Sequence, residues 1–257
     1  MGERIASVEF SEKVSALTRK FDAWGIDTVA VDGDDTIWQT LAHFSQTFAD
    51  IAGILNTSKD NIDAAIWGTL KEFGINPHGK YISVLMACRW AGFSDDSHET
   101  LTALARMDKF YTSEAPDLYE GTIELLDALN ATGRGTILAT HADPDWTLVK
   151  RVYSGLLGKF SDVIAFDIDI PKSVQWGDKL QSRKVDPGRL LVFGDSPLSD
   201  MLPIAKLGAR GILVENGMTK HYSNETASVS ELEPFFQNGK IIRSPYTKDI
   251  LSILINS

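Results

Sequence analysis

Residues 27–38 read DTVAVDGDDTIW, a short apolar run followed at once by acidic residues. The run DTVAV does not alternate with polar residues, as is typical of a strand buried on both faces. Asp32, Asp34 and Asp35 then crowd three carboxylates into four positions. Two carboxylates 4 Å apart in a partly screened environment repel by roughly 4 kcal/mol. The stretch therefore indicates a bound cation or a covalent chemistry that uses the carboxylates.

Four more short apolar runs follow this one, each preceded by a segment with helical character. They are GTILAT (135–140), DVIAF (162–166), LLVFG (190–194) and GILV (211–214). The segment SPLSDMLPIAKLG begins with Ser196 as a predicted N-cap and Pro197 at the first helical position. Alternating strands and helices predict an α/β fold, a Rossmann-like three-layer core with a parallel sheet. The amphipathic stretch 11–24 predicts an extra N-terminal helix packed on this core.

One interval, from Gln39 to about Lys109, lacks any strand pattern. Apolar residues recur there at spacings of three and four, and short polar or glycine-containing breaks separate the runs. This pattern predicts an all-helical cap domain, residues 38–110, inserted into a core domain formed by residues 1–37 and 111–257. We expect the cap over the carboxyl-terminal edge of the sheet, where open α/β sheets bind ligands.

The amino-acid composition of the chain excludes some classes of binding partner. The 257 residues include 25 basic and 35 acidic ones, for a net charge of -10, and no stretch clusters lysine and arginine as a nucleic-acid groove requires. No apolar run approaches the roughly 18 residues that span a bilayer. The charge and the apolar runs therefore predict a protein that binds neither nucleic acid nor membranes. The single cysteine, Cys88, and an opening without the apolar core of a signal peptide predict a cytoplasmic location.

Polar residues follow several of the predicted strands. Asp32 and Asp34 come just after the first strand, and the two-residue period of an extended chain lets both side chains point to the same side. Thr140 ends the second strand, Lys172 lies in the predicted loop after the third, and Asp195 follows the fourth. Because parallel strands end at a common edge, we expect these five side chains to converge there.

Four ordered motifs give the chain a family resemblance. DGDDT (32–36) resembles the DxDxT motif of the haloacid dehalogenase-like hydrolases, which are mostly phosphatases, and GDSPLSD (194–200) resembles their GDxxxxD motif. Thr140 and Lys172 correspond in order and spacing to the second and third motifs of that family. The resemblance covers about residues 26–218, including a helical cap in the place where one subclass of the family carries it.

The resemblance implies a Mg²⁺-dependent phosphatase. In it, Asp32 attacks phosphorus and forms an aspartyl phosphate, while Asp34 protonates the leaving alkoxide and later deprotonates water. Mg²⁺ is held by the Asp32 carboxylate, the Asp34 backbone carbonyl and Asp195, and it offsets the repulsion between phosphate and carboxylate.

The resemblance also assigns the groups that bind the substrate. Thr140 and Lys172 contact the phosphoryl oxygens, with Gly33 and His141 as further substrate-binding positions. Asp200 orients Lys172 or a metal-bound water. The partner is a small phosphorylated metabolite, because a cap over the crevice leaves little room for a larger substrate; the sequence indicates neither the metabolite nor an oligomeric state.

Several alternative functions remain open at this point. A phosphomutase differs only in the fate of the aspartyl phosphate, whereas a haloacid dehalogenase uses the same nucleophile without the metal. A receiver-like switch would need Asp167 or Asp169, after the third strand, as its phosphorylated residue. A catalytically silent binding protein on the same scaffold is the fourth.

Some residues also have simpler structural interpretations. Asp35 or Thr36 could cap the first helix of the cap domain, and either Thr140 or Asp143 could cap the helix that contains WTLVKRVY (146–153). Lys172 could be a solvated surface lysine. In that case the lysine of the third motif would be one of two others nearby, Lys179 and Lys184.

Overall fold

The computed structural model describes residues 2–73, 77–217 and 226–257. The chain divides into two compact units. The first comprises 1–38, 118–141 and 157–257, and the second comprises 39–117 and 142–156. Over the described residues, no helix is both long and apolar enough to cross a membrane.

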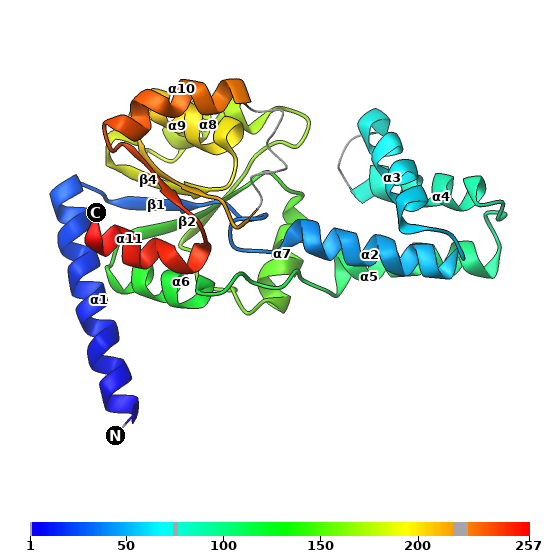
Figure 1. The fold of residues 1–257 in the computed structure, drawn as a ribbon, viewed down its shortest axis with the longest axis horizontal. Coiled ribbons are helices and arrows are strands. Elements are labelled where there is room, and N and C mark those ends of the chain that lie inside the picture. The colour runs from blue at the N-terminus through cyan, green and yellow to red at the C-terminus, as the bar shows by residue number, and fades with distance from the viewer. Residues whose placement is uncertain (1, 74–76, 218–225) are drawn as a thin grey trace. The chain divides into compact units, whose positions relative to one another are not determined.

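A parallel sheet of six strands forms the centre of the first unit (Figure 1), in the order β3-β2-β1-β4-β5-β6. The strands are β1 (Thr28–Val31), β2 (Gly135–Thr140), β3 (Asp162–Ala165), β4 (Leu190–Gly194), β5 (Arg210–Val214) and β6 (Ile241–Ser244). The five strands predicted from apolar runs are confirmed. The sixth was not predicted, because IIRS offers only two adjacent apolar residues and places an arginine in the strand.

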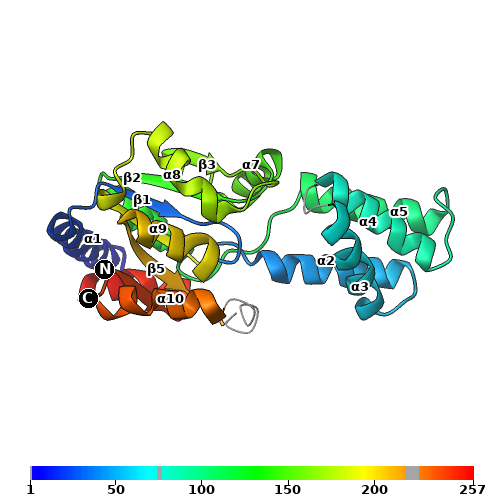
Figure 2. The same ribbon diagram turned by 90° about the horizontal axis from the view of Figure 1, so that it is seen from above.

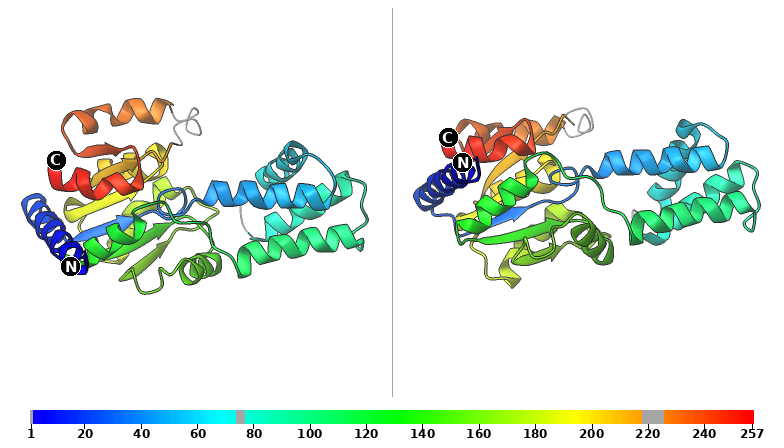
Figure 3. Two further views of the ribbon diagram at one scale, coloured as in Figure 1. Left: turned by 60° about the horizontal axis from the view of Figure 1, so that its bottom comes forward. Right: turned by 90° about the horizontal axis from the view of Figure 1, so that it is seen from below.

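Helices cover both faces of this sheet (Figure 1), so the predicted α/β three-layer core is confirmed. One face carries α8 (Lys172–Ser182), α9 (Leu202–Leu207) and α10 (Thr226–Gln237); the other carries α1 (Gly2–Trp24), α6 (Thr122–Ala131) and α11 (Ile250–Asn256). The predicted N-terminal helix is therefore present and longer than 11–24. It lies beside α11 (Figure 3), where Lys20 donates a hydrogen bond to the backbone carbonyl of Ser257.

The strand register aligns the carboxyl ends of the three central strands. Val31, the last residue of β1, lies opposite Leu138 of β2 and Phe193 of β4. The next residue, Asp32, continues the ladder, since its N–H donates to the Phe193 carbonyl at 2.8 Å. Short 3-10 or π turns lie next to the strands: η1 (Pro187–Arg189), η2 (Pro197–Met201) and η4 (Thr247–Asp249).

The second unit is helical (Figure 2). Its helices are α2 (Thr40–Ile54), α3 (Lys59–Phe73), α4 (Pro77–Trp90), α5 (His98–Thr112) and α7 (Pro144–Tyr153). Its own core is rich in aromatic residues, and the ring of Trp146 lies 5.2 Å from that of Phe110 and 5.4 Å from that of Tyr111. This packing explains why residues 142–156, which the sequence placed in the core domain, group with the inserted helices. Residues 111–117 group with them as well, whereas Trp38, which was predicted in the cap domain, groups with the first unit. The compact units therefore differ from the predicted domain boundaries at three places.

Candidate active site

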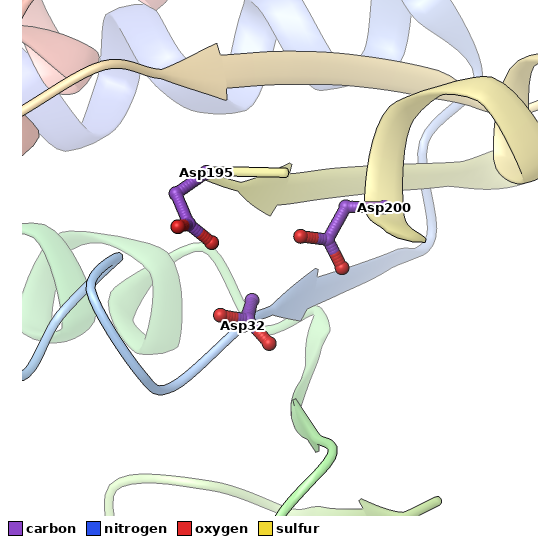
Figure 4. Close-up of side chains that lie close together, drawn as sticks. All are labelled: Asp32, Asp195 and Asp200. Atoms are coloured by element: carbon purple, nitrogen blue, oxygen red, sulfur yellow. The ribbon is translucent and has the colours of Figure 1, made fainter. Parts of the chain in front are cut away.

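Three buried carboxylates meet at the carboxyl edge of the sheet (Figure 4). Asp32 follows β1, Asp195 follows β4, and Asp200 lies in the turn η2. One oxygen from each of the three carboxylates lies within 4.8 Å of an oxygen of the other two. Asp32 is only 6% exposed. The sequence predicted that Asp32 and Asp195 converge, and the structure brings them together with Asp200.

A single lysine pairs with two of these carboxylates. The Lys172 ammonium lies 2.5 Å from Asp32 Oδ1 and 2.6 Å from Asp200 Oδ1, and it donates to the Ala139 carbonyl at 2.9 Å. Lys172 was predicted to lie in a loop, but it is the first residue of α8 and is 3% exposed. This position aims its side chain at the strand ends.

The other two candidate lysines lie elsewhere. Lys179 donates to the Ala165 carbonyl at 3.0 Å, and Lys184 is exposed at the surface. Lys172 is therefore the lysine of the acidic cluster.

The cluster carries excess negative charge. Three carboxylates and one ammonium leave two negative charges when all are ionised. Burial raises the pKa of Asp32 to about 7, because the charges of Asp200 and Asp34 add to desolvation and outweigh the attraction of Lys172. Burial together with Asp32 and Asp200 also raises the pKa of Asp195 well above its usual range. For Lys172, the charges of Asp200 and Asp32 outweigh burial, which alone would lower its pKa, and the net pKa is raised.

Thr36 joins two of the acids. Its hydroxyl lies 3.2 Å from Asp32 Oδ2 and 3.4 Å from Asp195 Oδ1. Thr36 does not cap the first helix of the second unit, since the residue before α2 is Gln39 and forms no side-chain cap bond. The sequence predicted no role for Thr36 in the site, although the position of Thr36 in DGDDT was the available signal.

Thr140 offers a hydroxyl to this site. It is the last residue of β2, and its Oγ1 is buried without a hydrogen-bond partner. This atom lies 3.3 Å from the point where a Cβ on Gly33 would stand, next to the Asp32 backbone. Asp143, not Thr140, caps α7, because Asp143 Oδ1 accepts from the N–H groups of Asp145 and Trp146 at 3.0 Å. A buried donor without an acceptor suits an oxygen-rich ligand.

A comparison with models of protein families shows to which family the chain belongs. The family model of the haloacid dehalogenase-like hydrolases matches residues 26–208, which include Asp32, Thr140, Lys172 and the 194–200 turn. The chain belongs to the haloacid dehalogenase-like hydrolases. No curated protein sequence matches it.

Solved structures of this family share the fold at low sequence identity. A haloacid dehalogenase-like hydrolase from Xanthomonas campestris is 17% identical, with a TM-score of 0.65 over 89% of this chain and 94% of that one. A predicted phosphoglycolate phosphatase from Haemophilus somnus (16%, TM-score 0.57) and an L-2-haloacid dehalogenase from Xanthobacter autotrophicus (11%, TM-score 0.60) each cover 89% of this chain and 98% of their own. The proteins with a similar fold thus include a predicted phosphatase and a dehalogenase.

Three further predicted site residues of this haloacid dehalogenase-like hydrolase lie near the cluster in sequence. Asp34 is partly exposed and forms an isolated bridge with Trp38, and its carboxylate does not belong to the close group of three. Gly33 is buried, and a Cβ there would stand 2.8 Å from the Trp38 ring. The exposed His141 has Nε2 2.8 Å from the Asp167 carbonyl; since a carbonyl only accepts, Nε2 carries the proton.

Gly194 lets the Asp200 side chain approach β4, which leads to a first prediction. A Cβ on Gly194 would stand 2.5 Å from Asp200 Cγ, so Gly194→Ala must displace the partner of Lys172. We expect a loss of about 1–3 kcal/mol in the free energy of unfolding, as for other overpacked sites, measured by urea titration. Gly53→Ala, in α2 with nothing within 4 Å of its Cβ, is the control and should be neutral or slightly stabilising. Equal stability of the two variants would contradict this account of Gly194.

Proposed function

We propose that this hydrolase is a Mg²⁺-dependent phosphatase that acts on a small phosphomonoester. The observation that carries the proposal is the charge of the buried cluster, in which three carboxylates are accompanied by one lysine that pairs with two of them. A phosphate dianion would be repelled by such a site unless a cation were bound there. A divalent ion supplies two positive charges, which is the number needed to neutralise the cluster.

The ligand set fits Mg²⁺. Every candidate ligand is an oxygen, and Mg²⁺ prefers carboxylate, carbonyl and water oxygens. The residues that would hold it are Asp32 and Asp195 through their carboxylates and Asp34 through its backbone carbonyl. The bound ion would neutralise charge on the phosphate and keep the carboxylates ionised. Asp200, 2.6 Å from Lys172, is better placed to orient that lysine.

Two carboxylates would share the chemistry. Asp32 attacks phosphorus in line and forms an aspartyl phosphate, while Asp34 donates a proton to the departing alkoxide. Asp34 then removes a proton from the attacking water, and the phosphorus–oxygen bond to Asp32 breaks to release inorganic phosphate. The partial exposure of Asp34 is consistent with exchange of protons with solvent.

The remaining residues would bind the transferring group. The unpartnered Thr140 hydroxyl donates to one phosphoryl oxygen, and the Lys172 ammonium, next to Asp32 Oδ1, supplies positive charge. The backbone at Gly33 and the exposed ring of His141 complete the predicted substrate-binding set. A small phosphorylated metabolite remains the proposed partner, because the helical insertion follows directly on the loop of Asp32.

Other activities on this scaffold would leave features of the site unused. In a haloacid dehalogenase, Asp32 would attack a carbon atom of the substrate without a metal. The two excess negative charges of the cluster would then repel the carboxylate of that substrate. A phosphomutase would pass the phosphoryl group to a second hydroxyl instead of water. A receiver-like switch would need Asp167 or Asp169 as acceptor, yet both lie outside the acidic group, and Asp167 Oδ1 accepts from the Asp169 N–H. A catalytically silent binding protein would not need the complete set of acidic residues of the four motifs.

The decisive experiment assays the purified protein with two substrates. With p-nitrophenyl phosphate we expect phosphate release that requires Mg²⁺ and stops with EDTA. With 2-chloropropionate we expect no chloride release under either condition. Chloride release in EDTA without phosphatase activity would replace the proposal by dehalogenation. Transfer of labelled phosphate to a sugar hydroxyl instead of water would identify a mutase.

A further inference from the structure

Side chains from the C-terminal part of the chain hold the loop that carries the proposed nucleophile. We propose that Asn216 and Thr247 are positioning residues that fix the backbone of residues 32–38 and, through Thr36, the carboxylates of Asp32 and Asp195. Both lie beyond residues 26–208, the part matched by the family model. The inference rests on the proposed function for its metal-affinity and activity tests, whereas its structural part concerns the loop itself.

The contacts form a closed network. Asn216 Nδ2 donates to the Asp35 carbonyl at 2.9 Å and to the Thr36 carbonyl at 3.3 Å, while Asn216 Oδ1 accepts from the Thr247 N–H at 2.9 Å. The Thr247 hydroxyl donates to the Thr36 carbonyl at 2.6 Å and accepts from Asn216 Nδ2 at 3.0 Å. Two consecutive loop carbonyls are thus bound by two residues that are distant in sequence.

The local backbone suits these contacts. Asn216 follows β5 with a φ of 43°, a left-handed conformation that asparagine tolerates better than most residues. Thr247 is 1% exposed and begins η4. Close packing holds this turn, because a Cβ on Gly121 would stand 2.6 Å from the Lys248 Cα. At the far end of the loop, the Tyr119 N–H donates to the Ile37 carbonyl at 2.9 Å.

Thr36 transmits this restraint to the acids. Its carbonyl is bound by Thr247, and its hydroxyl lies 3.2 Å from Asp32 Oδ2 and 3.4 Å from Asp195 Oδ1. A shift of the Thr36 backbone would therefore move the hydroxyl that spaces the two carboxylates. Metal binding and in-line attack both depend on that spacing, since small displacements of reacting groups cost large factors in rate.

The test compares two substitutions at one position. Thr247→Val keeps the shape and removes the hydroxyl, whereas Thr247→Ser keeps the hydroxyl. For Thr247→Val we expect about a tenfold loss of Mg²⁺ affinity in calorimetry and about a tenfold loss of kcat, with KM little changed. Thr247→Ser should stay within about twofold of wild type. Thr136→Val is the matched control, because Thr136 is buried in β2 of the same unit and its hydroxyl has no partner.

Hydrogen exchange separates positioning from general stability. The N–H groups of Asp35, Ile37 and Trp38 are bonded within the loop, and in Thr247→Val we expect them to exchange about tenfold faster while the sheet amides keep their rates. Unchanged loop exchange and metal affinity would overturn the inference, as would Thr247→Ser behaving like Thr247→Val. Faster loop exchange in a protein without phosphatase activity would instead refute the proposed function and leave the positioning role standing.

Discussion

Asp32→Asn should abolish phosphatase activity, by about four or more orders of magnitude, while the chain stays folded. An amide cannot form the aspartyl phosphate, and loss of a catalytic nucleophile typically removes nearly all chemical rate enhancement. The measurement is single-turnover hydrolysis of p-nitrophenyl phosphate with Mg²⁺ present. Asp35→Asn is the matched control, since Asp35 is a buried acid of the same loop outside the three-carboxylate group. We expect it to keep activity within about tenfold of wild type.

The same variant should be more stable than the wild type in EDTA. Because burial raises the pKa of Asp32 to about 7, the folded protein keeps this acid protonated at pH values where the unfolded chain ionises it, and this difference costs stability. The cost is fully present above about pH 7 and absent below about pH 4, the pKa of the unfolded chain. At about pH 8, Asp32→Asn should therefore gain up to about 4 kcal/mol in the free energy of unfolding, at about 1.36 kcal/mol per pKa unit. No gain in EDTA would contradict the raised pKa of Asp32, and retained turnover would remove Asp32 from its proposed role as nucleophile.

The sequence predicted those parts of the site that lie directly at strand ends. Asp32, Thr140 and Asp195 could be placed because a buried apolar run fixes where a parallel strand ends, and strand register then brings the ends together. Lys172 was identified by its order in the chain, although its place at the start of α8 was missed. A helix start could not be seen there because Pro171, which precedes it, forms no side-chain cap bond.

Residues that act on the backbone escaped prediction for a different reason. Asn216 and Thr247 bind the backbone carbonyls of Asp35 and Thr36. Every residue has a backbone carbonyl, so the sequence does not indicate which side chain will bind a given one. These contacts also span about 180 to 211 positions along the chain. The strand β6 was missed with them, so nothing in the sequence connected the C-terminal segment to the active site.

Lys172→Met should destabilise the protein without Mg²⁺ by about 3–5 kcal/mol, the usual cost of removing one partner of a buried ion pair. Lys172 pairs with Asp32 and Asp200, so its loss changes the net charge of Lys172 and the three carboxylates from two to three negatives when all are ionised. Methionine keeps the length of the side chain and cannot pair with Asp32 or Asp200. The measurement is urea unfolding at about pH 8 in EDTA. Lys179→Met is the control on the same helix, because Lys179 bonds only a backbone carbonyl.

Acid and Mg²⁺ should each reduce the deficit of Lys172→Met. The raised pKa values of Asp32 and Asp195 mean that lowering the pH from about 8 to 5 protonates these carboxylates in the folded state and removes their repulsion. Lys172 itself stays protonated across this range, because its own pKa is raised, so the change in the deficit comes from the carboxylates. Mg²⁺ should restore stability by supplying the missing positive charge, while turnover stays low. A deficit that neither acid nor Mg²⁺ reduces would show that Lys172 stabilises the fold by packing, and the charge argument for a divalent cation would fail with it.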